Sequence, residues 1–99
     1  MIELYELRQF ITFAETGTLS EAAEVLHLSQ PALSRNMKKL EEDLGITLFE
    51  RKKNKLTLNK NGEYVLDLAK KLLEDADTLA TKARDYDRKN RTIFLGVCA

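Results

Sequence analysis

The chain has 99 residues, one cysteine and a formal net charge of zero, with 43% hydrophobic and 32% charged residues. This length allows one domain with an extension, and so much charge with so little glycine and proline favours helices over a sandwich or barrel. Cys98 alone excludes an internal disulfide, and no segment is apolar enough for a membrane span or a signal peptide. We therefore expect a cytoplasmic protein without a membrane partner.

The charges are unevenly distributed along the chain. Residues 1–26 contain five acidic residues and one basic residue, whereas residues 27–60 contain four acidic and eight basic residues. From residue 61 onward, seven of each sign cancel. A basic middle segment is a candidate nucleic-acid surface, although a solvated charged face would give the same pattern.

Two helices are predicted in the first part of the chain. Apolar residues at three- and four-residue steps indicate a first helix that stops at Gly17: Leu4, Leu7, Ile11 and Ala14. Thr18 and Glu21 have the spacing of a capping box, which predicts that a short second helix begins there. His27, the only histidine, lies at the end of that helix, and no second His or Cys is placed to complete a metal site.

A third helix is predicted to begin after Ser29, which is a good N-cap. Pro31 falls in the first turn, where its missing N–H donor costs little. The helix runs to about Gly45 and turns one apolar stripe inward: Leu33, Met37, Leu40 and Leu44. The opposite side therefore carries a polar stripe: Gln30, Ser34, Arg35 and Lys38. Only about three residues separate this helix from the second, which is the helix-turn-helix arrangement.

The period of the pattern changes after Gly45. Four apolar residues then occur in two short extended runs: Ile46, Leu48, Leu56 and Leu58. These runs flank a basic tip that consists of Arg51, Lys52, Lys53, Asn54 and Lys55. The pattern predicts a two-stranded hairpin with cations at its tip, called the wing.

A long fourth helix is predicted from about residue 61 to residue 89, with Asn59 as its cap. Its apolar positions recur at steps of three and four: Val65, Leu68, Leu72, Ala76, Leu79, Ala83 and Tyr86. A domain this small cannot cover so long a stripe, so we expect a second copy of the chain to pack against it.

The last apolar run, Thr92 to Val97, is interpreted as the first strand of a larger domain, so the chain is expected to be a piece of a longer regulator. A tail without fixed structure is the alternative, because a lone strand has no sheet to join. The predicted organisation is residues 1–59 as one domain, 60–90 as a linker helix and 91–99 as the start of a further domain.

The stretch "AAEVLHLSQPALSRNMKKLEEDLG", followed by "LFER" and a Gly-Glu pair that opens a long helix, resembles the N-terminal DNA-binding region of LysR-type transcriptional regulators. The resemblance covers roughly residues 3 to 90. It implies a mostly α fold: a winged helix-turn-helix, made of a three-helix bundle and a β-hairpin wing, followed by a long dimerisation helix. The family pattern "LT-x-A-G" reads "LNKNG" here, with Asn59 in place of Thr and Asn61 in place of Ala.

The resemblance also implies partners. They are double-stranded DNA with approximate dyad symmetry and a second copy of the chain, with a tetramer possible in the full-length protein. A small-molecule effector would bind only the C-terminal domain, whose first strand "IFLGVCA" resembles. The dimerisation residues would be Val65, Leu68, Leu72, Ala76, Leu79 and Ala83.

With the third helix in the major groove, each residue of the polar stripe has a candidate role. Gln30 can bond to an adenine edge, Arg35 can approach guanine acceptors or a phosphate, and Ser34 can do either. Pro31 presents an apolar surface suited to a thymine methyl. Phosphate or minor-groove contacts are expected from lysines and from helix starts: Lys38, Lys39, Lys52, Lys53, Lys55, Thr18, Ser20 and Ser29. Arg51 is equally compatible with DNA contact and with a bond inside the protein.

Catalysis is not expected, since the sequence has no nucleophile with a partner base, no glycine-rich phosphate loop and no metal cluster. No cofactor is predicted. The predicted function is sequence-specific DNA binding in a dimeric bacterial-type transcriptional regulator. The alternative is a protein-interaction module that acts through the long amphipathic helix.

Overall fold

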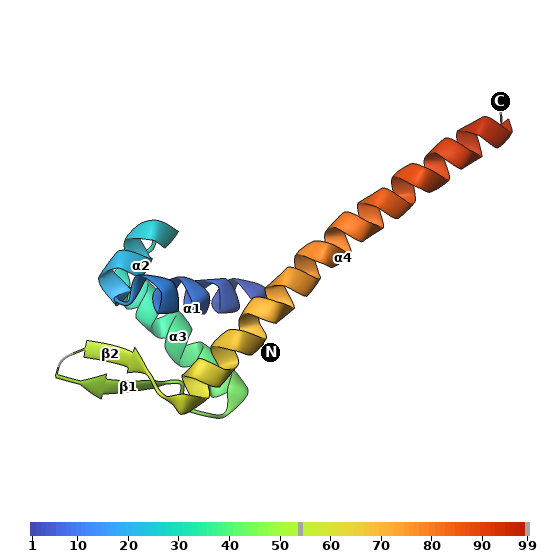
Figure 1. Ribbon diagram of the computed structural model, residues 1–99. Coiled ribbons are helices and arrows are strands. Elements are labelled where there is room, and N and C mark those ends of the chain that lie inside the picture. Colours follow the sequence, from blue (N-terminus) through green and yellow to red (C-terminus); the bar gives the residue numbers. More distant parts are fainter. Residues whose placement is uncertain (54, 99) are drawn as a thin grey trace.

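The computed structural model describes residues 1–53 and 55–98, and the side chains of residues 1–53 and 55–90. Three helices and a hairpin form a head: α1 (Leu4–Thr16), α2 (Leu19–Leu26), α3 (Gln30–Leu44), β1 (Phe49–Lys52) and β2 (Lys55–Leu58). The last helix, α4 (Lys60–Cys98), begins in the head and projects from it as a rod (Figure 1). The molecule is therefore elongated, with extents of 69 × 25 × 21 Å.

Hydroxyl caps begin α2 and α3 at the predicted residues. The Thr18 hydroxyl accepts a hydrogen bond from the Glu21 N–H at 3.1 Å, and the Ser29 hydroxyl accepts one from the Ala32 N–H at 3.2 Å. Pro31 lies in the first turn of α3. Each cap satisfies a backbone donor that the helix cannot, which contributes about 1 kcal/mol per cap.

The head helices end on residues in the left-handed conformation. Gly17 ends α1 with φ 88° and Gly45 ends α3 with φ 73°, as predicted. α2 ends on His27, with φ 58°, and the Leu28 N–H reaches back to the Ala23 carbonyl at 2.9 Å. This backbone bond closes the last turn of α2 and makes the connection to α3 tight.

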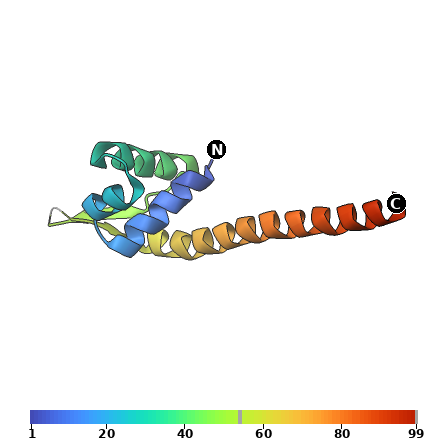
Figure 2. The same ribbon diagram turned by 90° about the horizontal axis from the view of Figure 1, so that it is seen from above.

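One apolar core joins the head helices, the hairpin and the first turns of α4. Its buried members are Leu7, Phe10, Phe13, Ala22, Ala23, Leu33, Met37, Leu40, Leu48 and Ala69. Phe49 of β1 meets the rings of Phe10 and Phe13 edge-on, with centroids 5.7 and 5.4 Å apart. Figure 2 shows α1 against the start of α4, so the rod is packed onto the head.

The hairpin is antiparallel, as predicted, with Phe49 opposite Leu58, Arg51 opposite Leu56 and Lys52 opposite Lys55. This register pairs the apolar ends of both strands near the core. The lysine pair stands next to the tip. The wing is therefore anchored at its apolar root and cationic at its outer end.

The first strand begins later than predicted. Ile46 and Leu48 precede β1. The Ile46 N–H donates to the Glu41 carbonyl at 3.2 Å, and the Leu48 N–H donates to the Glu41 carboxylate at 2.7 Å. Because these donors bind the end of α3, the segment cannot pair with β2 there. Leu48 is fully buried instead, whereas Ile46 is 41% exposed.

The predicted strand from Thr92 to Val97 is wrong, because the backbone continues as α4 to Cys98. A strand needs a neighbour to bond its backbone, and the hairpin is the only sheet in the part of the chain that the structure describes. A helix satisfies those groups within itself. Among the described residues, no helix is apolar enough along its length to cross a membrane.

Candidate nucleic-acid interface

α3 presents a ridge of polar side chains opposite its buried side. Leu33, Met37 and Leu40 are at most 2% exposed and fix the rotation of the helix against the core. The opposite side is exposed at four positions that together form the polar ridge: Gln30, Ser34, Arg35 and Lys38. Pro31 and Lys39 are exposed beside it. The sequence therefore predicted correctly which side of α3 faces outward.

The beginning of α3 protrudes because α2 can approach it closely. Ala22 and Ala23 are 0% and 4% exposed in the contact between α2 and its neighbours. Small side chains there bring the helices together without filling the space in front of the ridge. Gln30 and Ser34 consequently lie at an outer surface of the head.

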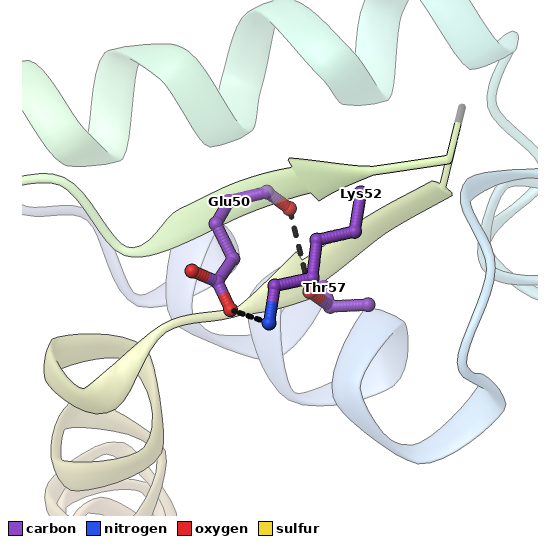
Figure 3. A network of polar contacts seen from close by, with 3 residues as sticks. All are labelled: Glu50, Lys52 and Thr57. Atoms are coloured by element: carbon purple, nitrogen blue, oxygen red, sulfur yellow. Dashed lines mark hydrogen bonds and ion pairs between the residues drawn. The ribbon is translucent and has the colours of Figure 1, made fainter.

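The wing adds a second group of cations. Lys52, Lys53 and Lys55 are exposed, and Lys53 adopts the left-handed conformation at the tip, with φ 48°. Figure 3 shows Lys52 paired with Glu50 at 3.3 Å, with side chains 71% and 45% exposed. The Thr57 hydroxyl donates to the Glu50 carbonyl at 3.4 Å across the hairpin. So exposed an ion pair contributes little, and Lys52 can leave it for a phosphate.

A hollow between α2, α3 and the wing brings several predicted site residues together. Thr18 and Ser20 line it from the start of α2, Gln30 lines it from α3, and Arg51 and Lys55 line it from the wing. The start of α2 offers backbone N–H groups and the positive end of the helix dipole. Two cationic side chains face the same space, so this hollow suits an anion such as a phosphate.

A second hollow lies between α3 and the wing. Ser34, Lys38 and Glu41 line it from α3, and Arg51 and Leu56 line it from the hairpin. Arg51 is exposed and lines both hollows. The sequence left open whether Arg51 faces outward or inward. Arg51 belongs to β1 of the wing and lines both hollows beside α3, which makes it part of the candidate interface.

Several other polar residues have structural roles. His27 ends α2, and the Glu41 carboxylate accepts the Leu48 N–H, so it is not a free acid. Ser29 is exposed while its hydroxyl caps α3. The side chain of Cys98 lies outside the described residues. Within the described part of the chain, no three His, Cys, Asp or Glu side chains gather as a metal site would require.

α4 carries two apolar rows rather than one. Leu66, Ala69 and Leu73 form a row toward the head: Ala69 is 3% exposed, Leu66 packs on the core, and Leu73 lines a groove together with Ile11 of α1. The stripe predicted from the sequence does not include this row. The sequence does carry its signal, since these residues also follow steps of three and four.

The second row, called the α4 seam, consists of Leu68, Leu72, Ala76, Leu79 and Ala83. Leu68 and Leu72 are about half exposed, at 49% and 48%, and Leu79 is 70% exposed. Val65, also predicted for dimerisation, is only partly exposed because it packs on the core of its own head. The head therefore leaves the seam largely uncovered.

Residues 4–63 match the family described as bacterial regulatory helix-turn-helix protein, lysR family. The chain is 38% identical over 96 residues to an uncharacterized HTH-type transcriptional regulator, YbhD, of Escherichia coli K12, covering 97% of this chain and 30% of that protein. It is 44% identical over 79 residues to the HTH-type transcriptional regulator BsdA of Bacillus subtilis, covering 76% of this chain and 27% of that protein. The chain thus spans less than a third of these relatives.

The same architecture occurs in solved structures. The crystal structure of the CbnR DBD–DNA complex superposes with a TM-score of 0.79 at 38% identity, covering 84% of this chain and 95% of that one. The bundle and hairpin are therefore the winged helix-turn-helix predicted from the sequence, and α4 is the long helix predicted to follow it.

Proposed function

The chain belongs to the LysR family of bacterial helix-turn-helix regulators, and from this premise we propose that it is the sequence-specific DNA-binding part of a dimeric transcriptional regulator. α3 would enter the major groove, and the wing would follow the flanking backbone or minor groove. The observation that carries the proposal is that the polar ridge and the wing cations share one face of the head, on which Arg51 lines both hollows.

The polar ridge supplies the groups that read bases. The Gln30 amide both donates and accepts, which matches an adenine edge, and the Arg35 guanidinium matches the two guanine acceptors. Ser34 stands one helical turn beyond Gln30 and can bond to either base or phosphate. Pro31 offers an apolar surface to a thymine methyl and brings no donor that would need a partner.

Around the ridge, cations and helix starts would hold the phosphates. Lys38 extends the ridge away from the helix start, and Arg51 with Lys55 faces the start of α2. The remaining proposed backbone contacts are Thr18, Ser29, Lys52 and Lys53. Such contacts orient the head on the duplex and supply most of the affinity for any sequence.

A second copy of the chain would cover the α4 seam. Half-exposed leucines on a rod without other cover are the apolar surface that self-association buries. Leu72, Leu79 and Tyr86 recur every seven residues, as a coiled-coil seam requires, and Ala76 and Ala83 do so beside them. Two heads held by one rod pair would present two ridges to a site with approximate dyad symmetry.

An antiparallel pair with its two-fold axis at Leu79 satisfies these positions together. It puts Leu72 opposite Tyr86 of the second copy and Ala76 within one residue of Ala83 of the second copy. Since a two-fold axis brings the same flank of both rods together, Asp75 then lies within one residue of Lys82 of the second copy. The apolar and the charged positions therefore favour one register.

Because the chain spans 30% or less of the relatives compared above, the properties of the whole regulator are proposals as well. Residues 1–59 would be the DNA-binding domain and 60–90 the linker helix. Residues 91–99 would lead into a domain that binds a small-molecule effector, and full-length copies could assemble into tetramers. The protein would act in the cytoplasm, where bacterial DNA lies, without catalysis and without a cofactor.

Selection of bound duplexes from a random pool tests the proposal directly. We expect enrichment of one motif with approximate dyad symmetry, and retention on mixed genomic DNA at low salt that falls as salt rises. No enriched motif and no retention at any salt would overturn DNA binding. That result would favour a protein-interaction module acting through α4.

A further inference from the structure

Two asparagine side chains stabilise the join between the wing and α4. β2 ends at Leu58 and α4 begins at Lys60, so a single residue, Asn59, connects them. The Thr47 carbonyl accepts from the Asn59 amide at 3.1 Å and from the Asn61 amide at 3.0 Å. Two amides from the start of α4 therefore hold one carbonyl from the segment that precedes β1.

Backbone bonds make the same join tight. The Asn59 side-chain oxygen accepts from the Gly62 N–H at 2.8 Å, which caps α4. The Asn59 N–H donates to the Leu48 carbonyl at 2.9 Å. A Cβ on Gly62 would collide with that carbonyl, so α4 and the Leu48 backbone are in the closest contact that glycine allows.

One further hydrogen bond connects this join to α3. The Leu48 N–H donates to the Glu41 carboxylate at 2.7 Å. Glu41 lies on α3, one turn beyond Lys38 of the polar ridge. A chain of short contacts therefore runs from the helix that would read DNA to the helix that would pair two copies.

The angle at this join matters because the polar ridge lies well away from it. Gln30 lies about 16 Å along α3 from Glu41, at about 1.5 Å per residue. A change of about 10° at the join would therefore move Gln30 by about 3 Å, and because a two-fold axis moves both heads alike, the separation of the two ridges would change by up to about 6 Å. This exceeds the roughly 3.4 Å that separates neighbouring base pairs.

We propose that Asn61 is a positioning residue that, with Asn59, fixes the angle between the head and α4 and thereby sets the half-site separation that the dimer accepts. The proposal rests on the proposed function, since it presupposes a dimer on a two-fold site. Asn61 itself touches no DNA in this assignment. It acts on specificity only through the Thr47 carbonyl.

The test uses duplexes that the parent protein selects from a random pool, remade with one base pair added to or removed from the middle. We expect the parent to bind the altered separations at least tenfold more weakly than the selected one. Asn61→Ala should reduce this discrimination to threefold or less, while its affinity for a single half-site changes by less than twofold. Asn61→Asp, which keeps the shape of the side chain but loses its N–H donor, should reduce the discrimination in the same way.

Thr81→Ala is the control, because it removes a polar side chain from an exposed position of α4 on the side away from the seam. It should keep the parental discrimination. If both Asn61 variants discriminate as the parent does, the positioning role is overturned and DNA binding stands. If the parent enriches no two-fold motif, both the proposed function and the positioning role of Asn61 are overturned. Thermal unfolding of each variant confirms that the fold is retained.

Discussion

The wing lysines and the polar ridge should affect DNA binding differently: the ridge should set sequence preference and the lysines should not. Lys53 stands at the wing tip, where phosphate is the expected partner. Lys53→Ala should therefore weaken binding to selected and unrelated duplexes alike and lower the salt slope by about 2, since each copy of the dimer loses one phosphate contact. Binding measured across a salt series checks this. Lys70→Ala on α4 is the control, and a loss confined to the selected duplex would contradict the phosphate role.

Gly45 and Gly62 are needed for different reasons, the first for its backbone conformation and the second for the space beside it. Gly45 has φ 73° with open space around it, so Gly45→Ala should cost only the strain of that conformation, about 1 kcal/mol. Gly62 lies inside α4, where helix propensity alone would favour alanine by about 1 kcal/mol. Its missing Cβ would meet the Leu48 carbonyl, so Gly62→Ala should instead destabilise by about 2–3 kcal/mol. Urea unfolding followed by circular dichroism measures both, and a Gly62→Ala protein as stable as the parent would refute the packing at the join.

The two asparagines at the join mark what a single sequence can and cannot predict for a residue. Asn59 was predicted as a helix cap, and its side chain accepts the Gly62 N–H. That role depends on neighbours three residues away. Asn61 stands where the family pattern has alanine, and its partner Thr47 lies 14 residues earlier in the chain. No local rule brings those two residues together, so the bond was found only in the structure.

At the level of elements, local chemistry predicted helix ends well. Thr18, Ser29, Gly17 and Gly45 all have the roles expected of them, because caps depend on backbone groups within a few residues. Strands were less predictable. The run from 92 to 97 has strand-like composition but no partner strand in the described chain, so helix geometry prevails there.

The sequence also could not show how much of the apolar surface of α4 the head covers. Periodicity indicates which apolar residues share one side of the helix, but not which of them the head itself covers. Ala69 and Leu73 turn toward α1, while Leu72 and Leu79 remain exposed. Only the placement of α1 separates the two rows. The seam proposed for a second copy is therefore shorter than the stripe predicted from the sequence, because Val65 packs on the core of its own head.

Charge on the seam should convert dimers to monomers. Leu72→Glu combined with Leu79→Glu places two carboxylates on the α4 seam of each copy, where they would be buried against their counterparts. Sedimentation should show a monomer with an intact head. Lys70→Glu with Thr81→Glu, both at exposed positions on the other side of α4, is the control and should remain dimeric. A double seam variant that stays dimeric would show that the copies meet elsewhere.

The proposed register makes a separate prediction at the same element. Asp75→Lys would set two lysines against each other at both symmetric positions and should weaken the dimer roughly three- to tenfold. Adding Lys82→Glu reverses both charges and should restore most of the affinity. Dimer dissociation measured by sedimentation at low salt distinguishes these cases. Additive losses in the double variant would exclude the antiparallel register with its axis at Leu79.

The shape of the whole molecule separates the surface proposed to contact DNA from the surface proposed to bind a second copy. The head stands at one end of a molecule 69 Å long, and α4 extends away from it as a rod (Figure 1). The seam lies along this rod. The order of elements and the outward side of α3 were predictable from patterns within each helix. The angle between head and rod was not, since it depends on the contacts that Thr47, Leu48 and Glu41 make across the fold.

The affinity ratio between the selected duplex and a scrambled one, compared for the parent and Arg35→Ala, tests most directly whether the polar ridge reads bases. We predict that Arg35→Ala costs about 1–3 kcal/mol per half-site on the selected duplex, relaxes preference at one base position in each half-site and leaves scrambled DNA bound nearly as before. An unchanged ratio in Arg35→Ala would contradict the assignment of the ridge to the major groove.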